Sequence, residues 1–305
     1  QWRNIKELKR FRHGHDSSGI AGTMPRSLIV PCHACPHPDV NLPSGWQDAP
    51  AATSWLYTIF LAEDACFKQK ACKRKHDDAD PQLSPGLGVV VDPAKYFSLL
   101  NANPSNQDEI SGCSSFNSIE QANSKCHKGC RSQGIGACSC ARHESYLSVG
   151  DLLRDEAYLP MDYIFLSALA STSILLVMMS YNIACQWWRN FYSRMENMPE
   201  DLRLSSKCTI QFRVPKLHLV GHTDKCRPHF SFNYTPRTGV MDGEGVEHQW
   251  AWLNAAAPSL SMMRAGGRWD VLNDYCNYWN WLKTKNLRTQ LSLLFCFVRA
   301  GKADA

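Results

Sequence analysis

Short runs of apolar residues alternate along the chain with segments that mix apolar and polar positions. The runs are rich in β-branched and aromatic side chains, which is typical of buried strands, whereas the mixed segments indicate helices that bury one face. The expected strands are residues 55–61, 174–180 and 209–214, and the expected helices are residues 2–11, 184–195 and 269–285. This alternation is compatible with an α/β fold.

Residues 163–181 carry no charge and are about long enough to cross a bilayer. Several serine and threonine residues interrupt the run, and its flanks show no clear asymmetry of basic residues. A helix up to Ala170, a turn and then the buried strand 174–180 explain the same residues. We therefore expect no membrane partner, with a membrane-anchored protein as the less favoured alternative.

Changes in composition divide the chain into five segments. Residues 1–54 are expected to hold an N-terminal helix and a cysteine knuckle, and residues 55–100 the first part of the core. Residues 101–149, rich in Ser, Asn, Gln and Gly, are expected to form a loop-rich, partly disordered insertion. The second part of the core and its C-terminal helices occupy residues 150–285, and residues 286–305 form an aberrant tail. The chain starts at Gln1, and we interpret it as a fragment or truncated gene product.

The bulk composition is that of a folded protein. Of its 305 residues, 44% are hydrophobic and 20% charged, which excludes wholesale disorder. The formal charge of +5 permits a nucleic-acid partner without requiring one. Fourteen cysteines, several of them near histidines at ligand-like spacing, favour a reducing compartment with metal-bound thiolates over a secreted disulfide framework.

Two cysteine and histidine pairs have the spacing of a zinc site. Cys32 and Cys35 form a Cys-x2-Cys knuckle, and Cys140 and His143 supply the complementary half. Together they would make a closed Cys3His zinc site that joins the N-terminal segment to the far side of the insertion. A solitary Cys-x2-Cys without metal is the alternative.

A second set, His218, His222 and Cys226, would share one face of a helix. Cys185 could complete such a metal site. Gly221 weakens the helix prediction, and partly buried histidines without metal are the simpler interpretation.

Acidic or amide side chains lie at the ends of predicted strands and on a predicted helix. Asp64 and Asn182 each follow an apolar run, and Glu244 and Glu247 have the spacing of one helical face. Cleavage of a phosphodiester by two metal ions needs oxygen ligands from separate elements, and Mg²⁺ prefers carboxylates. Taken singly, each acid could equally be an ordinary surface group.

A run of basic residues follows Asp64 and could contact DNA phosphates beside that residue. It comprises Lys68, Lys70, Lys73, Arg74 and Lys75. The last three resemble a minimal nuclear localisation patch, although a solvated strand end is the simpler interpretation.

Seven segments resemble, in order, successive motifs of the fungal Kyakuja–Dileera–Zisupton (KDZ) transposases. They are residues 32–46, 56–70, 150–169, 180–190, 214–226, 230–254 and 268–281. The resemblance covers most of residues 2–285 and fails over 101–136. It implies an α/β fold with a ribonuclease-H-like mixed sheet core, a loop-rich insertion and flanking helices.

The resemblance also implies a DDE-type triad that holds Mg²⁺ or Mn²⁺. Asp64 matches the first aspartate, in a motif that reads D-A-C-F where the family has D-A-N-F. Glu244 or Glu247 matches the glutamate of D-G-E-x-x-E-R-x-W, with His248 in place of the arginine.

Asn182 stands where the family has the second aspartate, within S-Y-N-I-A-C-Q-W. The implied activity is cleavage and transfer of DNA strands in the nucleus, with transposon ends and target DNA as partners, and a homo-oligomer is compatible with it. A neutral amide removes one negative charge from the metal site, so this copy is expected to be impaired. A non-catalytic DNA- or zinc-binding remnant of a transposon is the alternative.

Overall fold

The computed structural model describes residues 2–13, 17–103, 129–154, 156–170 and 172–303. Its strands are β1 Ile59–Cys66, β2 Ala71–Cys72, β3 Cys130–Ser132, β4 Gly134–Cys140, β5 Tyr146–Leu152, β6 Leu176–Tyr181 and β7 Thr209–Arg213. Its α-helices are α1 Trp2–Arg10, α2 Pro93–Ala102, α4 Tyr158–Leu169, α5 Ala184–Trp187, α6 Phe191–Met195, α7 Lys216–Leu219, α8 Cys226–Phe230, α9 Gly245–Leu253, α10 Ala257–Ser261 and α11 Ala265–Ala303.

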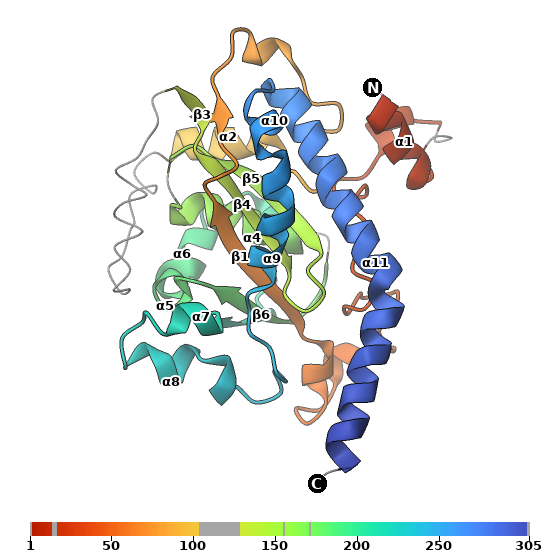
Figure 1. The fold of residues 1–305 in the computed structure, drawn as a ribbon, viewed down its shortest axis with the longest axis vertical. Helices are drawn as coiled ribbons and strands as arrows, with labels where there is room; N and C mark the ends of the chain where they lie inside the picture. The colour runs from red at the N-terminus through yellow and green to blue at the C-terminus, as the bar shows by residue number, and fades with distance from the viewer. Residues whose placement is uncertain (1, 14–16, 104–128, 155, 171, 304–305) are drawn as a thin grey trace.

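Five strands form one mixed sheet in the order β5-β4-β1-β6-β7 (Figure 1). β4 runs antiparallel to both β1 and β5, whereas β6 is parallel to β1 and β7 is parallel to β6. The parallel strands are entered through helices, since β6 follows α4 and β7 follows α5 and α6. The predicted α/β class with a mixed sheet is therefore confirmed.

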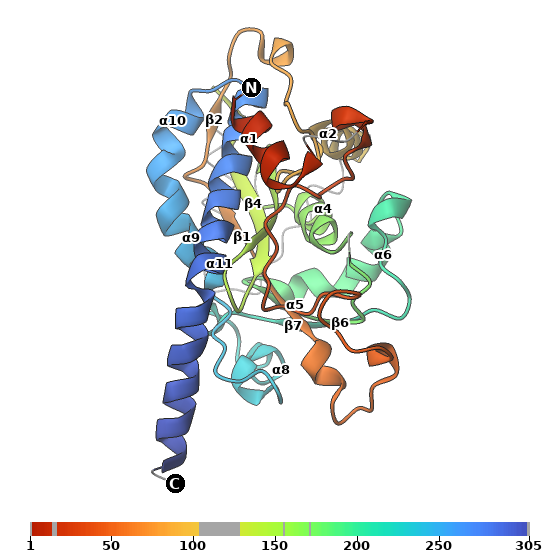
Figure 2. The same cartoon turned by 90° about the vertical axis from the view of Figure 1, so that its right-hand side faces the viewer.

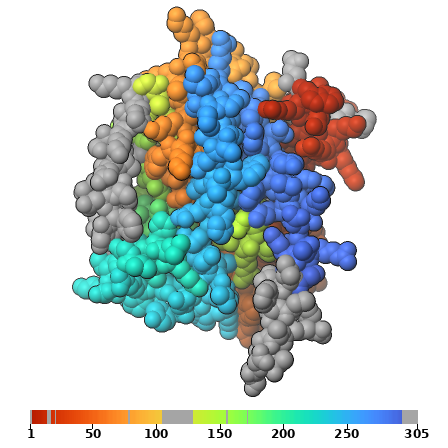
Figure 3. All heavy atoms as spheres, viewed as in Figure 1, coloured from red at the N-terminus to blue at the C-terminus, as the bar shows by residue number. Residues whose placement is uncertain are grey.

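Helices cover both faces of the sheet (Figure 2). Successive side chains of β1 point to opposite faces, so Ile59 and Leu61 enter the core beneath α4. Phe60 and Ala62 enter the core beneath α9 and α11 instead. Figure 3 shows that α9, α10 and α11 cover much of this second face. β1 is consequently buried on both sides.

Residues 130–149 differ from the expected organisation. The sequence predicted a loop-rich insertion over residues 101–149, but β3, β4 and part of β5 lie within it, and β4 is a direct neighbour of β1. That prediction was wrong for residues 130–149, while residues 104–128 lie outside the described residues.

Small residues in β4 and β5 let α4 lie close to the sheet. Gly136 pairs with Gly150 across these strands. A Cβ atom would lie 2.8 Å from the Ile164 side chain of α4 at Gly136, and 3.0 Å from it at Gly150. All residues of β4 are buried. A strand of Gly, Ala, Ser and Cys gives little apolar signal, and its composition therefore resembles that of a loop.

The remaining predicted elements are found with shifted boundaries. Residues Ser54–Tyr57 form a 3₁₀ helix, and β1 extends beyond Glu63 and Asp64, so these acids lie within the strand and not after it. Residues 163–181 divide into the end of α4, a connection and β6, as the prediction of a helix, a turn and a strand had it. Throughout the described ranges, no helix combines the length and hydropathy needed to cross a membrane.

The long helix α11 continues beyond residue 285, so no helix end marks the expected boundary of a tail at 286–305. Near its start, α11 is fixed to β5 through buried charges. Asp151 accepts hydrogen bonds from Arg268 and from Trp269 Nε1, the latter at 2.9 Å, and Arg131 lies 3.4 Å away. Arg268 is completely buried.

Two buried asparagines of α11 bind the backbone of distant segments. Asn277 accepts from Val30 N at 3.0 Å and donates to Leu28 O at 2.8 Å. Asn280 donates to Val30 O and both accepts from and donates to the backbone of Tyr146, at 2.7 and 2.8 Å. The N-terminal segment and the start of β5 are therefore held by the same helix.

Candidate functional site

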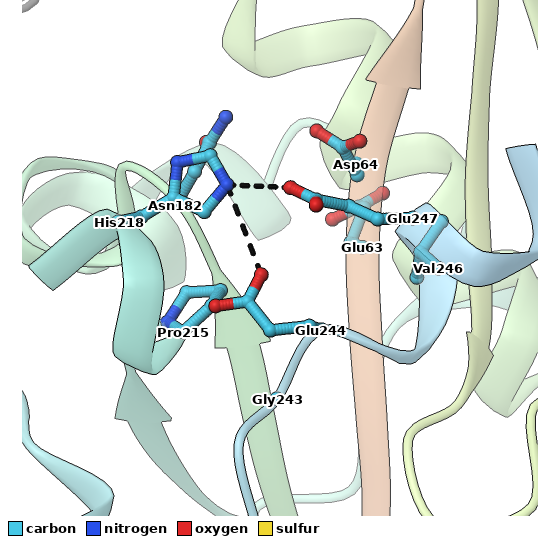
Figure 4. A pocket seen from close by; sticks show the side chains of 9 residues that line it. All are labelled: Glu63, Asp64, Asn182, Pro215, His218, Gly243, Glu244, Val246 and Glu247. Carbon is cyan, nitrogen blue, oxygen red and sulfur yellow. Dashed lines mark hydrogen bonds and ion pairs between the residues drawn. The ribbon is translucent and has the colours of Figure 1, made fainter.

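A small acidic pocket lies where β1 and the end of β6 meet the start of α9 (Figure 4). Its lining residues are Glu63, Asp64, Asn182, Pro215, His218, Gly243, Glu244, Val246 and Glu247. The structure thus brings together all four residues that the sequence predicted as a catalytic set. They come from three elements that are far apart in the chain.

Asp64 is held by a tryptophan of α9. Trp250 Nε1 donates a hydrogen bond to Asp64 Oδ2 at 2.7 Å. Burial raises the pKa of Asp64 to about 6, although the hydrogen bond from Trp250 opposes the shift. The carboxylate therefore sits where its ionised form is poorly solvated.

Glu244 is positioned by the turn that begins α9. Gly243 has a φ of 83°, and a Cβ atom at this position would lie 2.3 Å from Ser180 Oγ at the end of β6, so a glycine is required. Glu244 accepts a hydrogen bond from Leu217 N at 2.8 Å, while its Oε2 is buried and has no hydrogen-bond partner in the described ranges. Burial also raises the pKa of Glu244.

His218 belongs to this pocket. Its Nε2 lies 2.6 Å from Glu247 Oε1 and 3.8 Å from Glu244 Oε2 (Figure 4). The sequence grouped His218 with His222 and Cys226 on one helix, and that grouping is wrong. α7 ends at Leu219 after a single turn, so the helical spacing does not continue.

Asn182 directly follows β6, and its side-chain oxygen is buried with no hydrogen-bond partner among the described residues. Its backbone carbonyl accepts a hydrogen bond from His222 Nε2 at 2.9 Å. The backbone at this position is therefore fixed, while the amide oxygen remains available to a ligand in the pocket.

Glu63 is a member of the pocket that the sequence reasoning left out. Only 2% of the residue is exposed, and neither carboxylate oxygen has a hydrogen-bond partner within the part of the chain that the structure describes. Burial, reinforced by neighbouring acidic groups, raises the pKa of Glu63 well above its ordinary value. Its position beside Asp64 at the end of an apolar run was the available signal.

The donor atoms fit a hard divalent cation. His218, Glu244 and Glu247 each offer one ligand atom, and these three atoms all lie within 4.8 Å of one another. Buried oxygens without partners on Asn182 and Glu244 are the groups that a cation would satisfy. Carboxylate and amide oxygens are ligands that Mg²⁺ and Mn²⁺ accept. The pocket could therefore hold such an ion.

The four residues of the predicted Cys3His set come together at the C-terminal end of β4. The ligand atoms of Cys32, Cys35, Cys140 and His143 all lie within 4.8 Å of one another. Cys35 Sγ lies 3.1 Å from Cys140 Sγ, and Cys32 Sγ lies 3.2 Å from His143 Nδ1. The three cysteines are buried, and this donor set could bind zinc.

His222 and Cys226, which the sequence grouped with His218, lie together at another place. His222 and Cys226 meet Cys185, and the three ligand atoms again lie within 4.8 Å of one another. Cys185 and His222 are buried, and Cys226 is partly exposed.

The basic residues continue from the end of β1 through β2. Lys68, Lys73 and Lys75 are exposed, while Lys70 and Arg74 are partly buried. Arg74 Nε donates to Met262 O at 3.1 Å, which fixes this segment to the end of α10. The lysines are available to solvent, and their contact with DNA remains a prediction.

The fold and the pocket define a mixed α/β protein with an acidic site across two neighbouring parallel strands. A family model for the Kyakuja-Dileera-Zisupton transposase matches residues 57–280, which include every element that lines the pocket. The chain therefore belongs to the KDZ transposase family, as the sequence motifs predicted. No curated protein and no solved structure matches the chain.

Proposed function

We propose that the pocket is a DDE-type site for metal-dependent cleavage and transfer of DNA strands. The observation that carries the proposal is the meeting of Asp64, Asn182 and Glu244, from three separate elements, in one pocket. Membership of a transposase family supports the substrate class.

We further propose that the core is ribonuclease-H-like. Three antiparallel strands, β1, β4 and β5, occupy one half of the sheet, and two parallel strands extend it on the other side of β1. This is the strand order of the ribonuclease-H fold. In that fold the first two acidic ligands lie on the two neighbouring parallel strands at the centre of the sheet. In this chain β1 and β6 would be those strands.

Each side chain has a definite part in the proposed site. Asp64, held by Trp250, and Glu244, held by Leu217 N, would supply carboxylate ligands to Mg²⁺ or Mn²⁺. His218 would orient Glu247 through their 2.6 Å contact. A pair of such ions, when bound, activates the attacking oxygen and stabilises the leaving one.

Asn182 favours a second candidate function. Aspartate and asparagine have nearly the same shape, but the amide contributes no negative charge toward two divalent cations. The proposed activity of this copy is consequently weak or lost, and a non-catalytic DNA- or zinc-binding remnant of a transposon is the second candidate.

The proposed partners are the DNA of transposon ends and of the target, reached in the nucleus, and a homo-oligomer is compatible with this role. The exposed Lys68, Lys73 and Lys75 extend from the strand that carries Asp64. Lysines at such positions would contact DNA phosphates, and the binding would weaken as the salt concentration rises.

Replacing Asp64 with asparagine is expected to stabilise the metal-free protein at pH 7.5 by about 1–2 kcal/mol. The folded pKa of Asp64 is about 6 against an ordinary 3.8, so ionisation opposes folding. The cost is absent below pH 4, grows as the pH rises toward 6, and is complete above it. Asparagine can still accept the hydrogen bond from Trp250. Urea unfolding at pH 4 and pH 7.5 measures the difference.

The same variant tests the metal site. Mn²⁺ or Mg²⁺ is expected to raise the melting temperature of the unmodified chain and to have a much smaller effect on Asp64→Asn. Asp48→Asn, which removes an exposed carboxylate, is the matched control and should respond like the unmodified chain. Equal stabilisation of Asp64→Asn by the metal would exclude Asp64 as a ligand.

We also propose that Cys32, Cys35, Cys140 and His143 bind a structural zinc ion. Cys35→Ser is expected to remove about one zinc ion per chain and to lower the melting temperature, because metal binding and folding are linked. Elemental analysis with thermal unfolding measures both, and Cys72→Ser is the control outside the cluster. A folded protein that contains no zinc after purification without chelator would contradict the proposal.

A further inference from the structure

Cys185, His222 and Cys226 form a second sulfur and nitrogen cluster, separate from the Cys3His set. Cys185 lies in α5 just after β6, His222 follows α7, and Cys226 is the first residue of α8. Their ligand atoms all lie within 4.8 Å of one another. Three separate segments, all outside the sheet, therefore meet at these side chains.

The ring of His222 is oriented as metal-bound histidines usually are. Its Nε2 lies 2.9 Å from the carbonyl oxygen of Asn182, which can only accept, so Nε2 carries the proton. Nδ1 is then the lone-pair nitrogen, and it lies 3.4 Å from Cys185 Sγ. A ligating histidine typically donates its other N–H to a backbone carbonyl or carboxylate in this way.

The distance between the ligand atoms of Cys185 and His222 also matches tetrahedral zinc. Zinc bonds of about 2.3 Å to sulfur and 2.0–2.1 Å to nitrogen separate the two ligand atoms by about 3.5 Å at the tetrahedral angle. The observed separation of Cys185 Sγ and His222 Nδ1 is 3.4 Å. Thr223 Oγ1 donates to Cys226 Sγ at 3.4 Å, the kind of hydrogen bond that supports a metal-bound thiolate.

We propose that Cys185, His222 and Cys226 bind a second zinc ion, with water as the fourth ligand. The donors are two soft sulfurs and an imidazole, a set that selects zinc over Mg²⁺. The ion would hold α5, α7 and α8 together. Through His222 it would also fix the backbone carbonyl of Asn182 at the wall of the acidic pocket. The site does not depend on the proposed DNA chemistry.

Zinc content is the direct test. The full chain, purified under reducing conditions without chelator and supplied with Zn²⁺, is expected to hold about two ions, one at each cluster. Cys226→Ser should retain about one ion, and so should Cys35→Ser, whereas the double variant should hold none. Cys208→Ser, a partly exposed cysteine outside both clusters, should still hold two. Two ions in a folded Cys226→Ser protein would overturn the proposal.

Thiol labelling of the unmodified chain gives a second measurement that needs no variant. Cys226 is partly exposed, so an alkylating reagent can reach its sulfur and a bound metal would protect it. We expect Cys226 to be modified at least 10-fold more slowly with zinc than after chelation, as read by mass spectrometry. Equal rates in the two states, or a Cys185–Cys226 disulfide in protein that binds one ion only, would show that the cluster is not a zinc site.

Discussion

Replacing Asn182 with aspartate is expected to raise Mn²⁺- or Mg²⁺-dependent DNA cleavage by roughly 100-fold or more. Groups that merely orient metal ligands are worth about 10–100-fold, and a direct ligand should exceed that range. The substitution restores a full negative charge with almost no change of shape. Nicking of supercoiled DNA over a range of metal concentrations measures the gain.

The added charge should also have a cost in the absence of metal. The pocket already contains Asp64, Glu244 and Glu247, and a further carboxylate next to them repels their ionised forms. Asn182→Asp is therefore expected to melt at a lower temperature than the unmodified chain without metal, and to recover when Mn²⁺ or Mg²⁺ is added.

Two variants control this experiment. Asn190→Asp adds the same charge at an exposed position and should leave cleavage unchanged. Combining Asn182→Asp with Asp64→Asn should abolish the gain, because one ligand is restored while another is lost. Metal-dependent cleavage by the unmodified chain that survives Asp64→Ala would place the nuclease site elsewhere and contradict the proposed function.

The second large effect is expected at Asp151, where Ala should lower the free energy of unfolding by about 3–5 kcal/mol. Removal of this carboxylate leaves the buried guanidinium of Arg268 without its counter-charge. It also removes the acceptor for Trp269 Nε1. Chemical denaturation of the two proteins measures the loss.

An exposed ion pair provides the comparison. Lys95 and Asp201 lie 3.3 Å apart with more than half of each side chain exposed, so Asp201→Ala should cost less than about 1 kcal/mol. Similar losses for Asp151→Ala and Asp201→Ala would show that the buried network contributes little.

The pH dependence of the network follows from the pKa of Asp151. Burial alone would raise it, but Arg268 and Arg131 outweigh burial and hold the pKa below its ordinary value. The stabilisation is therefore complete above pH 4, near the unfolded pKa, and is lost only as the pH falls through the lower folded pKa.

The sequence predicted those parts of the fold whose side chains carry a strong apolar pattern. β6 and β7 were expected from their runs of branched residues, and the split of residues 163–181 into a helix and a strand was expected as well. β4 could not be predicted in this way, because its small residues give little apolar signal. Gly136, for example, is required by the close approach of Ile164 in α4. The space that requires a glycine is defined by a partner outside the strand.

The residues of the candidate site also fall into those that local motifs predict and those that only the fold brings together. Motifs indicated Asp64, Asn182 and the two glutamates, and spacing indicated the Cys3His set. The contact of His218 with Glu247 depends on where α7 ends and on how α9 packs beside it. A local sequence pattern shows neither. Glu63 was left out because no motif or ligand-like spacing marks it, and its place in the pocket depends on how β1 meets β6 and α9.

The asparagines of α11 have a consequence for the order in which the protein can be completed during synthesis. Asn277 and Asn280 bind the backbone of Leu28 and Val30, which lie just before Cys32. A ribosome must therefore extend the chain for some 250 residues beyond this segment before it can dock. Until then, the N-terminal cysteines lack that anchor, and they are open to oxidation or to capture of stray metal ions.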